Sequence, residues 1–151
     1  MSRILGGKKI EMNKFHKIMV CVTEQKTCER LITKGMEYRD STDGEICIIH
    51  VAIRGNKVIE DEKAAEALEY LFEIAVEYDA SLTVLRSNDV LKTLKDFALK
   101  NEIDLMIMGE TREVKEEDSV IFKLKKEFDR HRKDIKVKVV PLNLQQTKAI
   151  V

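Results

Sequence analysis

Short apolar runs rich in β-branched residues alternate along this chain with segments whose apolar residues recur at helical spacing. The two longest runs are Lys17 to Thr23 and Glu45 to Ala52, and both are apolar at most positions. Unbroken apolar runs, in contrast to strict alternation, are typical of strands that helices bury on both faces. Three shorter runs, Ser81 to Arg86, Asp104 to Gly109 and Lys136 to Val140, complete a predicted set of five strands.

Helical spacing predicts one helix between each pair of consecutive strands. The predicted helices are Thr27 to Arg39, Asp61 to Tyr78, Asp89 to Lys100 and Ser119 to His131. The residues of the second helix that we expect to face the core are Ala64, Ala65, Leu68, Leu71, Phe72 and Ala75. Asn88 is expected to cap the third helix. Because crossovers between parallel strands are right-handed, this alternation predicts an α/β fold: an open parallel five-stranded sheet with helices on both faces.

Length and charge restrict the class of protein further. A chain of 151 residues can bury one core without disulfides or metal ions. Its 27 basic and 27 acidic side chains cancel, so no overall field attracts nucleic acid or an anionic membrane. Three dispersed cysteines predict reduced thiols and a cytoplasmic location, and no apolar run is long enough for a membrane span. We expect a flexible N-terminal tail at residues 1–14, one α/β domain at 15–142 and a C-terminal tail at 143–151.

Open α/β sheets bind ligands beyond the carboxyl ends of their strands, which directs attention to three connecting segments. These are Thr23 to Lys26, Val51 to Arg54 and Gly109 to Ser119. In the last segment Gly109 ends a strand and Ser119 opens a helix. Backbone N–H groups and the positive end of a helix can hold a phosphate at such a place.

Other residues that could carry chemistry lack the pattern that the chemistry requires. His16, His50 and His131 have no carboxylate or thiol at a metal-ligand interval, so no metal site is expected, and His50 is interpreted as a hydrogen-bonded core residue. The basic residues on and after the fourth helix are interpreted as solvated surface, so nucleic acid is not an expected partner. No nucleophile motif or P-loop occurs, which predicts a protein without catalytic activity.

Five stretches carry a further signal: KIMVCVTEQKTCERLI, CIIHV, DLMIMGETR, DSV and KVKVVPL, which lie between Phe15 and Leu142. Together they resemble the universal stress protein domain, including the version carried inside potassium-sensing histidine kinases. The resemblance implies a Rossmann-like, adenine nucleotide alpha hydrolase-like fold with strand order 3-2-1-4-5. It also implies a role in the stress response and a homodimer formed through the last strand, Lys136 to Pro141.

Many members of that family bind ATP through an acidic residue after the first strand and a glycine-rich loop. This sequence keeps the first glycine as Gly109 and the hydroxyl at the start of the fourth helix as Ser119. Thr23 stands in place of the acidic residue, and Arg112 and Asp118 replace the second and third glycines. Glycine is wanted there because the backbone must approach the phosphate closely. The resemblance therefore implies a degenerate ATP site.

Two functions follow as expectations. The first is a non-catalytic regulatory or interaction protein, without a cofactor and with an unidentified protein partner. The alternative is a stress or ion-signalling sensor that binds ATP, AMP or a cyclic dinucleotide. Its candidate binding residues are Thr23, Val51, Gly109, Arg112, Ser119 and Val120. An enzyme is a third, weaker alternative, for which ATP turnover would be the evidence.

Overall fold

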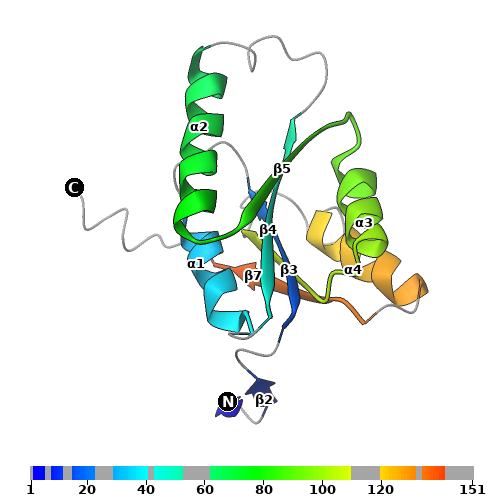
Figure 1. Cartoon of the computed structure of the whole chain (residues 1–151). Coiled ribbons are helices and arrows are strands. Elements are labelled where there is room, and N and C mark those ends of the chain that lie inside the picture. The colour runs from blue at the N-terminus through cyan, green and yellow to red at the C-terminus, as the bar shows by residue number, and fades with distance from the viewer. Residues whose placement is uncertain are drawn as a thin grey trace, which may run out of the picture.

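A parallel five-stranded sheet forms the centre of the molecule (Figure 1). The computed structural model describes residues 2–5, 8–11, 15–22, 29–40, 43–52, 62–109, 120–131 and 134–141. The strands of this sheet are β3 (Lys17–Val22), β4 (Glu45–Ala52), β5 (Ser81–Arg86), β6 (Leu105–Gly109) and β7 (Lys136–Val140). Their spatial order is β5-β4-β3-β6-β7. Numbered within this sheet alone, the order is 3-2-1-4-5, which confirms the predicted topology.

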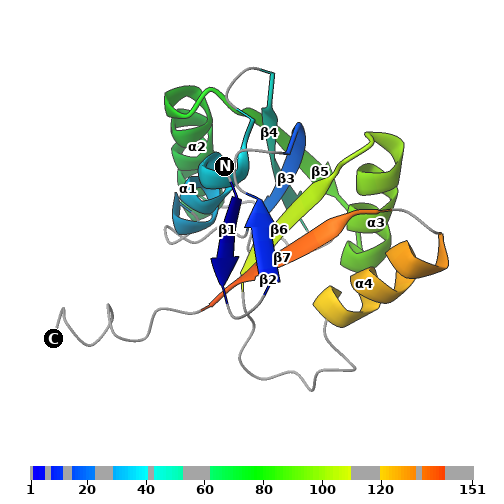
Figure 2. The ribbon, with the colours of Figure 1, turned by 90° about the horizontal axis from the view of Figure 1, so that it is seen from below.

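Two helices cover each face of the sheet (Figures 1 and 2). The helices are α1 (Glu29–Tyr38) and α2 (Glu62–Glu77) on one face, and α3 (Val90–Lys100) and α4 (Val120–Arg130) on the other. Successive residues of a strand point to opposite faces, so Ile18 and Val20 join the core under α1 and α2, whereas Met19 joins the core under α3 and α4. All three side chains are fully buried, which explains why the β3 run is continuously apolar. Among the described residues, no helix is both long and apolar enough to cross a membrane.

The edge strands β5 and β7 are less buried than the strands between them. Val84 of β5 is 41% exposed, and Lys136 of β7 is exposed. An edge strand has a neighbour on one side only, and lysine there discourages uncontrolled strand addition. Lys136 and Lys138 are in keeping with the position of β7 at an edge of the sheet.

A β-hairpin occupies part of the segment that we expected to be a flexible tail. β1 (Ser2–Leu5) pairs in antiparallel fashion with β2 (Lys8–Glu11), separately from the main sheet. The two residues between the strands are Gly6 and Gly7, a pair typical of tight hairpin connections. A tail was expected because residues 1–14 carry several charges and no long apolar run. The predicted C-terminal tail, residues 143–151, lies outside the described residues.

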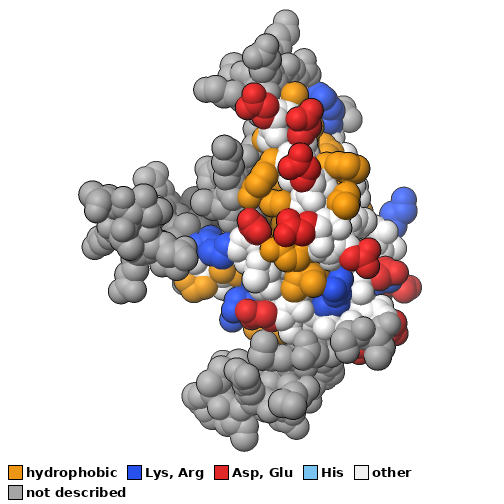
Figure 3. Space-filling view, turned by 60° about the vertical axis from the view of Figure 1, so that its left-hand side comes forward, with side chains coloured by type: hydrophobic (Ala, Val, Ile, Leu, Met, Phe, Trp, Pro, Cys, Tyr) orange, Lys and Arg blue, Asp and Glu red, His pale blue; other side chains and the backbone are white. Residues whose placement is uncertain are grey.

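The core-facing side of α2 agrees with the predicted one only in part: Leu71 and Ala75 are buried as expected, whereas Ala65 is exposed and Leu68 is partly buried. Leu71, Ile74 and Ala75 are at most 4% exposed, whereas Phe72 is 62% exposed and Val76 is 66% exposed. Phe72 was expected in the core, and this expectation was wrong. Figure 3 shows hydrophobic side chains lying between acidic ones on the outer face of the molecule around α2. Apolar residues occupy more than half of the circumference of α2, so periodicity alone does not select the buried side.

Candidate functional site

The carboxyl ends of β3 and β6 mark the point at which the connections leave the sheet in opposite directions. The two strands pair in parallel from Ile18 and Leu105 to Val20 and Ile107. From β3 the chain continues to α1 on one face, and from β6 it continues to α4 on the other. Open α/β sheets bind ligands beyond the strands at such a point. We refer to the carboxyl ends of β4, β3, β6 and β7 as the carboxyl edge.

The structure describes only part of the predicted site. Val51 lies near the end of β4, pairs with Leu85 and is partly buried. Gly109 ends β6 and pairs with Val140 of β7, and Val120 is the first residue of α4. Because β3 lies between β4 and β6, Val51 and Gly109 flank the strand that leads to Thr23. The candidate residues that lie outside the described residues are Thr23, Arg112 and Ser119.

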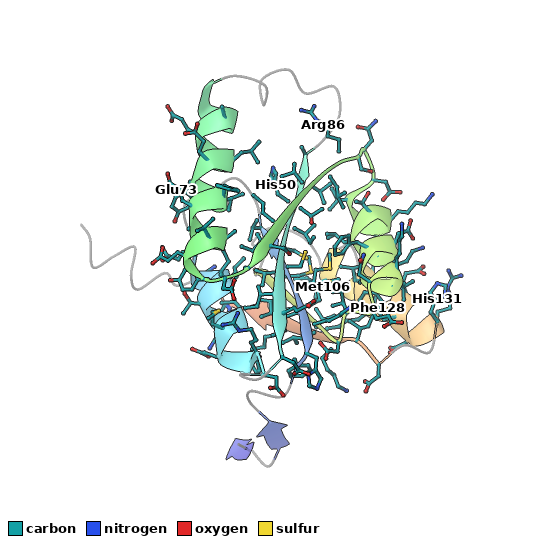
Figure 4. All side chains as sticks on the ribbon, viewed as in Figure 1. His50, Glu73, Arg86, Met106, Phe128 and His131 are labelled. Carbon is teal, nitrogen blue, oxygen red and sulfur yellow. The ribbon has the colours of Figure 1, made fainter. Side chains whose placement is uncertain are left out.

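His50 fixes the end of β3 from the neighbouring strand. Its side chain is 5% exposed and lies on the α1–α2 side of the sheet, opposite Met106 and Phe128 on the α3–α4 side (Figure 4). The Nδ1 atom donates a hydrogen bond of 3.2 Å to the carbonyl oxygen of Val22. A buried imidazole needs such a partner because unpaired polar groups are costly in a core. The expected hydrogen-bonded core role of His50 is confirmed, and the bond holds the last residue of β3 in place.

Packing against the described residues does not require glycine at position 109. A Cβ atom on Gly109 would lie 3.7 and 3.8 Å from the two methyl carbons of Leu31, which is ordinary van der Waals contact. Gly35 is different, because a Cβ there would lie 3.2 Å from the side chain of Val20. Close approach of the backbone to a ligand is a separate reason for glycine at the end of a strand. Substitution of Gly109 by alanine can therefore test ligand binding without disturbing the core.

Arg30 adds a positive charge at the carboxyl edge that the sequence analysis did not identify. It lies in the first turn of α1, and one guanidinium nitrogen donates a hydrogen bond of 2.9 Å to the carbonyl oxygen of Pro141, just after β7. Its Nε atom is buried and has no hydrogen-bond partner in the part of the chain that the structure describes. Arginine is well suited to phosphate because its planar fork of donors matches two oxygens. Only the packing of α1 against the end of β7 reveals this placement.

A pocket of about 280 Å³ opens at the opposite end of the sheet. Lys17, Glu45, Cys47 and Thr83 are among the residues that line it, and the sulfur of Cys47 lies 3.8 Å from the hydroxyl oxygen of Thr83. These residues begin β3, β4 and β5 or lie near their starts. The pocket is therefore distinct from the carboxyl edge and contains none of the predicted site residues.

His16 lies at the same end, just before β3, in contact with two carboxylates. Its Nδ1 atom is 2.8 Å from Asp43 and 3.9 Å from Asp40. The hydrogen bond to Asp43 is the largest cause of a pKa of His16 that is raised above its ordinary value of 6.5, and the charges of Asp43, Asp40 and Asp104 add to it. The sequence prediction missed this group because it considered only short ligand intervals, whereas Asp40 and Asp43 lie 24 and 27 positions from His16 in the chain. The only sequence signal for this group is that a histidine precedes one strand and two aspartates precede the next.

The structure is similar to solved structures of one protein class. A universal stress protein family protein from Arabidopsis thaliana with AMP bound has a TM-score of 0.59 and 15% sequence identity, with 87% of this chain and 95% of that chain covered. A universal stress protein from Lactobacillus plantarum has a TM-score of 0.56 and 16% identity, covering 83% and 97%. A universal stress protein in complex with cAMP has a TM-score of 0.56 and 12% identity, covering 83% and 96%.

These similarities define the class by its fold: an open, Rossmann-like α/β sheet with order 3-2-1-4-5. The particular fold is that of the universal stress proteins, as the sequence resemblance implied. No protein-family model matches the chain. No curated protein matches it in sequence either.

Proposed function

We propose that the protein is a non-catalytic regulatory protein of the universal stress type whose ATP site is degenerate. One observation carries this proposal. The segment that leaves the carboxyl edge after Gly109, residues 110–118, contains five acidic and two basic residues and no glycine. A triphosphate would meet repulsion there, and few positions would let the backbone approach it closely. Regulation would then depend on protein contacts.

A second candidate is a sensor of an adenine mononucleotide, with Thr23, Gly109 and Ser119 at its site. Two proteins of the same fold are described with AMP bound and in complex with cAMP. A monophosphate carries less negative charge than a triphosphate, so the acidic segment opposes it less. Arg30 supplies a guanidinium at the carboxyl edge, and Gly109 has no side chain to keep a ligand from the backbone at the end of β6.

Ligand recovery separates the two candidates. The purified full chain would be denatured, and the released small molecules would be identified by mass spectrometry. Calorimetric titration of the native chain with ATP and Mg²⁺, with AMP and with cAMP would follow. We expect no ATP to be recovered and no heat of ATP binding. Recovery or tight binding of ATP would contradict a degenerate site, whereas AMP or cAMP alone would favour the sensor.

Variants then locate any nucleotide that binds. We expect Gly109→Ala, and the double variant Arg112→Ala, Ser119→Ala, to weaken binding at least tenfold. Arg130→Ala is the matched control, because Arg130 ends α4 and pairs with Glu127 on the surface. Binding that survives the double variant unchanged would remove the proposed phosphate position.

A further inference from the structure

Three side chains of metal-ligand type meet at the amino-terminal end of the sheet. His16 precedes β3, Asp40 follows α1 and Asp43 precedes β4. One ligand atom from each lies within 4.8 Å of the other two. This end of the sheet is opposite the carboxyl edge, so the group is separate from the nucleotide site considered above.

The backbone holds these three residues in place before any ion binds. Phe15 N–H donates to the Tyr38 carbonyl at 3.1 Å, and Asp40 N–H donates to the Phe15 carbonyl at 2.9 Å. On the other side, Glu45 N–H donates to the His16 carbonyl at 2.7 Å. The segment carrying His16 is thus hydrogen-bonded both to the end of α1 and to the start of β4. Such fixed ligands lose little conformational freedom on binding.

A glycine, Gly44, directly follows the second aspartate. Gly44 N–H donates to the Asp40 carbonyl at 2.9 Å. A Cβ atom on Gly44 would collide with the side chain of Arg39 and the backbone of Asp40. Position 44 therefore requires glycine, and its hydrogen bond to Asp40 keeps the adjacent Asp43 close to Asp40.

Asp104, the residue just before β6, supports the group without occupying a ligand position. Its two carboxylate oxygens accept the backbone N–H groups of His16 at 2.9 Å and Lys17 at 3.0 Å. Both oxygens are engaged, so Asp104 contributes negative charge and fixes the backbone of His16. Partners that orient ligands in this way strengthen metal sites.

The spacing of the donor atoms fits a small divalent ion. Ligand atoms about 2.0–2.1 Å from a tetrahedral Zn²⁺ lie about 3.3 Å from one another. His16 Nδ1 lies 2.8 Å from Asp43 Oδ1, which is a hydrogen bond, and 3.9 Å from Asp40 Oδ2. Zn²⁺ would displace the hydrogen-bonding proton, and the first pair of atoms would move apart by about 0.5 Å. The side chains of His16 and Asp43 are 57% and 68% exposed, so an ion can enter and water can complete its coordination.

We propose that His16, Asp40 and Asp43 bind one divalent transition-metal ion, with Zn²⁺ as the best fit. One imidazole nitrogen and two carboxylate oxygens suit Zn²⁺ better than Mg²⁺ or Ca²⁺, which favour oxygen ligands throughout. The bound ion would link the start of β3 to the connection between α1 and β4. This departs from the expectation of no metal site, which considered only intervals along the chain.

Zinc titration of the full chain, stripped of metal with a chelator, tests the proposal. We expect one equivalent of Zn²⁺ to bind and to raise the melting temperature. His16→Ala and Asp43→Asn should each weaken binding more than about tenfold, since loss of an outer partner alone commonly costs that much. His131→Ala and Asp134→Asn are the matched controls, because both residues are exposed and form surface ion pairs. They should bind as the native chain does.

The absorption spectrum of bound Co²⁺ distinguishes binding at this group from binding by the three cysteines. Co²⁺ bound by nitrogen and oxygen shows no thiolate-to-metal charge-transfer band, and we expect none. Either that band or binding unchanged by His16→Ala would place the ion elsewhere and overturn the proposal. Absence of Zn²⁺ binding by the native chain would overturn it as well. The proposed function would be untouched in each case, because its ligand lies at the other end of the sheet.

Discussion

Cys21 shows what burial does to a thiol in this core. It lies on the α3–α4 side of β3, packed with Cys47 against apolar side chains of that cluster. A thiolate there would lose its hydration, and Cys47 adds a smaller effect, so the pKa of Cys21 rises from 9.0 to about 12. The thiolate is the reactive form of cysteine. Cys21 is therefore a partly buried thiol that stays protonated at neutral pH.

Thiol labelling tests the pKa of Cys21. A Cys28→Ser, Cys47→Ser variant leaves Cys21 as the single thiol for a disulfide reagent. At about pH 8 the folded variant should react up to about 1,000-fold more slowly than the denatured variant, because a shift of about three units lowers the thiolate population by that factor. Loss of Cys47 removes only the smaller cause of the shift, since burial is the larger one. A raised pKa means that the folded state holds the proton more tightly. The stability from this group is therefore complete below about pH 9 and falls as the pH rises toward 12. Equal labelling of folded and denatured chains would refute this assignment.

The start of α3 is set by one side chain, and it is not the predicted Asn88. Asp89 has an extended backbone, and its carboxylate accepts the N–H of Lys92 at 3.0 Å. The N–H of Asp89 donates to the hydroxyl of Ser87 at 3.0 Å. Asparagine and aspartate both cap helices well, so the Asn-Asp pair in the sequence did not decide between them. The hydrogen bond from the Lys92 N–H to the Asp89 carboxylate identifies Asp89 as the cap.

Substitutions at positions 88 and 89 measure how much the cap contributes to stability. Asp89→Ala should lower the free energy of unfolding by about 1 kcal/mol, because an N–H of the first turn loses its acceptor. Asn88→Ala should change it by less than about 0.5 kcal/mol, since Asn88 is exposed. Urea unfolding of both variants supplies the comparison. Equal losses would mean that the cap is shared or lies elsewhere.

α2 offers a second matched pair. Leu71 is 1% exposed and the adjacent Phe72 is 62% exposed. Leu71→Ala should cost about 2–5 kcal/mol, because it leaves a cavity against the sheet. Phe72→Ala should cost less than about 0.5 kcal/mol, although it removes the larger side chain. Thermal or urea unfolding measures both, and a larger loss for Phe72→Ala would show that the outer side of α2 is covered in solution.

At the scale of the whole molecule, the sheet could be predicted because its signal is local. Each strand shows its burial in its own sequence: Ile18 to Val20 are apolar without a break, and Lys136 and Lys138 mark an edge. Strand order then follows from the resemblance and the right-handed crossover. Contacts between segments that are far apart in the sequence produce no comparable sequence pattern. The pairing of His16 with Asp43, and of Arg30 with the Pro141 carbonyl, appears only when the strands are side by side.

The candidate site was predictable only in position. The rule for open sheets identifies the carboxyl edge, and Gly109 does end β6 there. The same rule does not say which side chains line the site, because these belong to the segments that connect the strands and not to the strands. Arg30 lies in the first turn of α1. That helix was predicted only from the spacing of its apolar residues.

The two edge strands of the sheet, β5 and β7, allow a matched test of the dimer that the resemblance implies. If β7 pairs with its copy across a two-fold axis, its outer backbone groups gain partners and the partly buried Val139 becomes more buried. Size-exclusion chromatography with light scattering should then report a dimer at tens of micromolar. Val139→Asp should give a monomer, because it brings a carboxylate into the interface. Val84→Asp on the opposite edge strand, β5, is the matched control and should stay dimeric. Circular dichroism confirms that both variants fold. A monomeric native chain would contradict the proposal, and a dimer lost only with Val84→Asp would move the interface to β5.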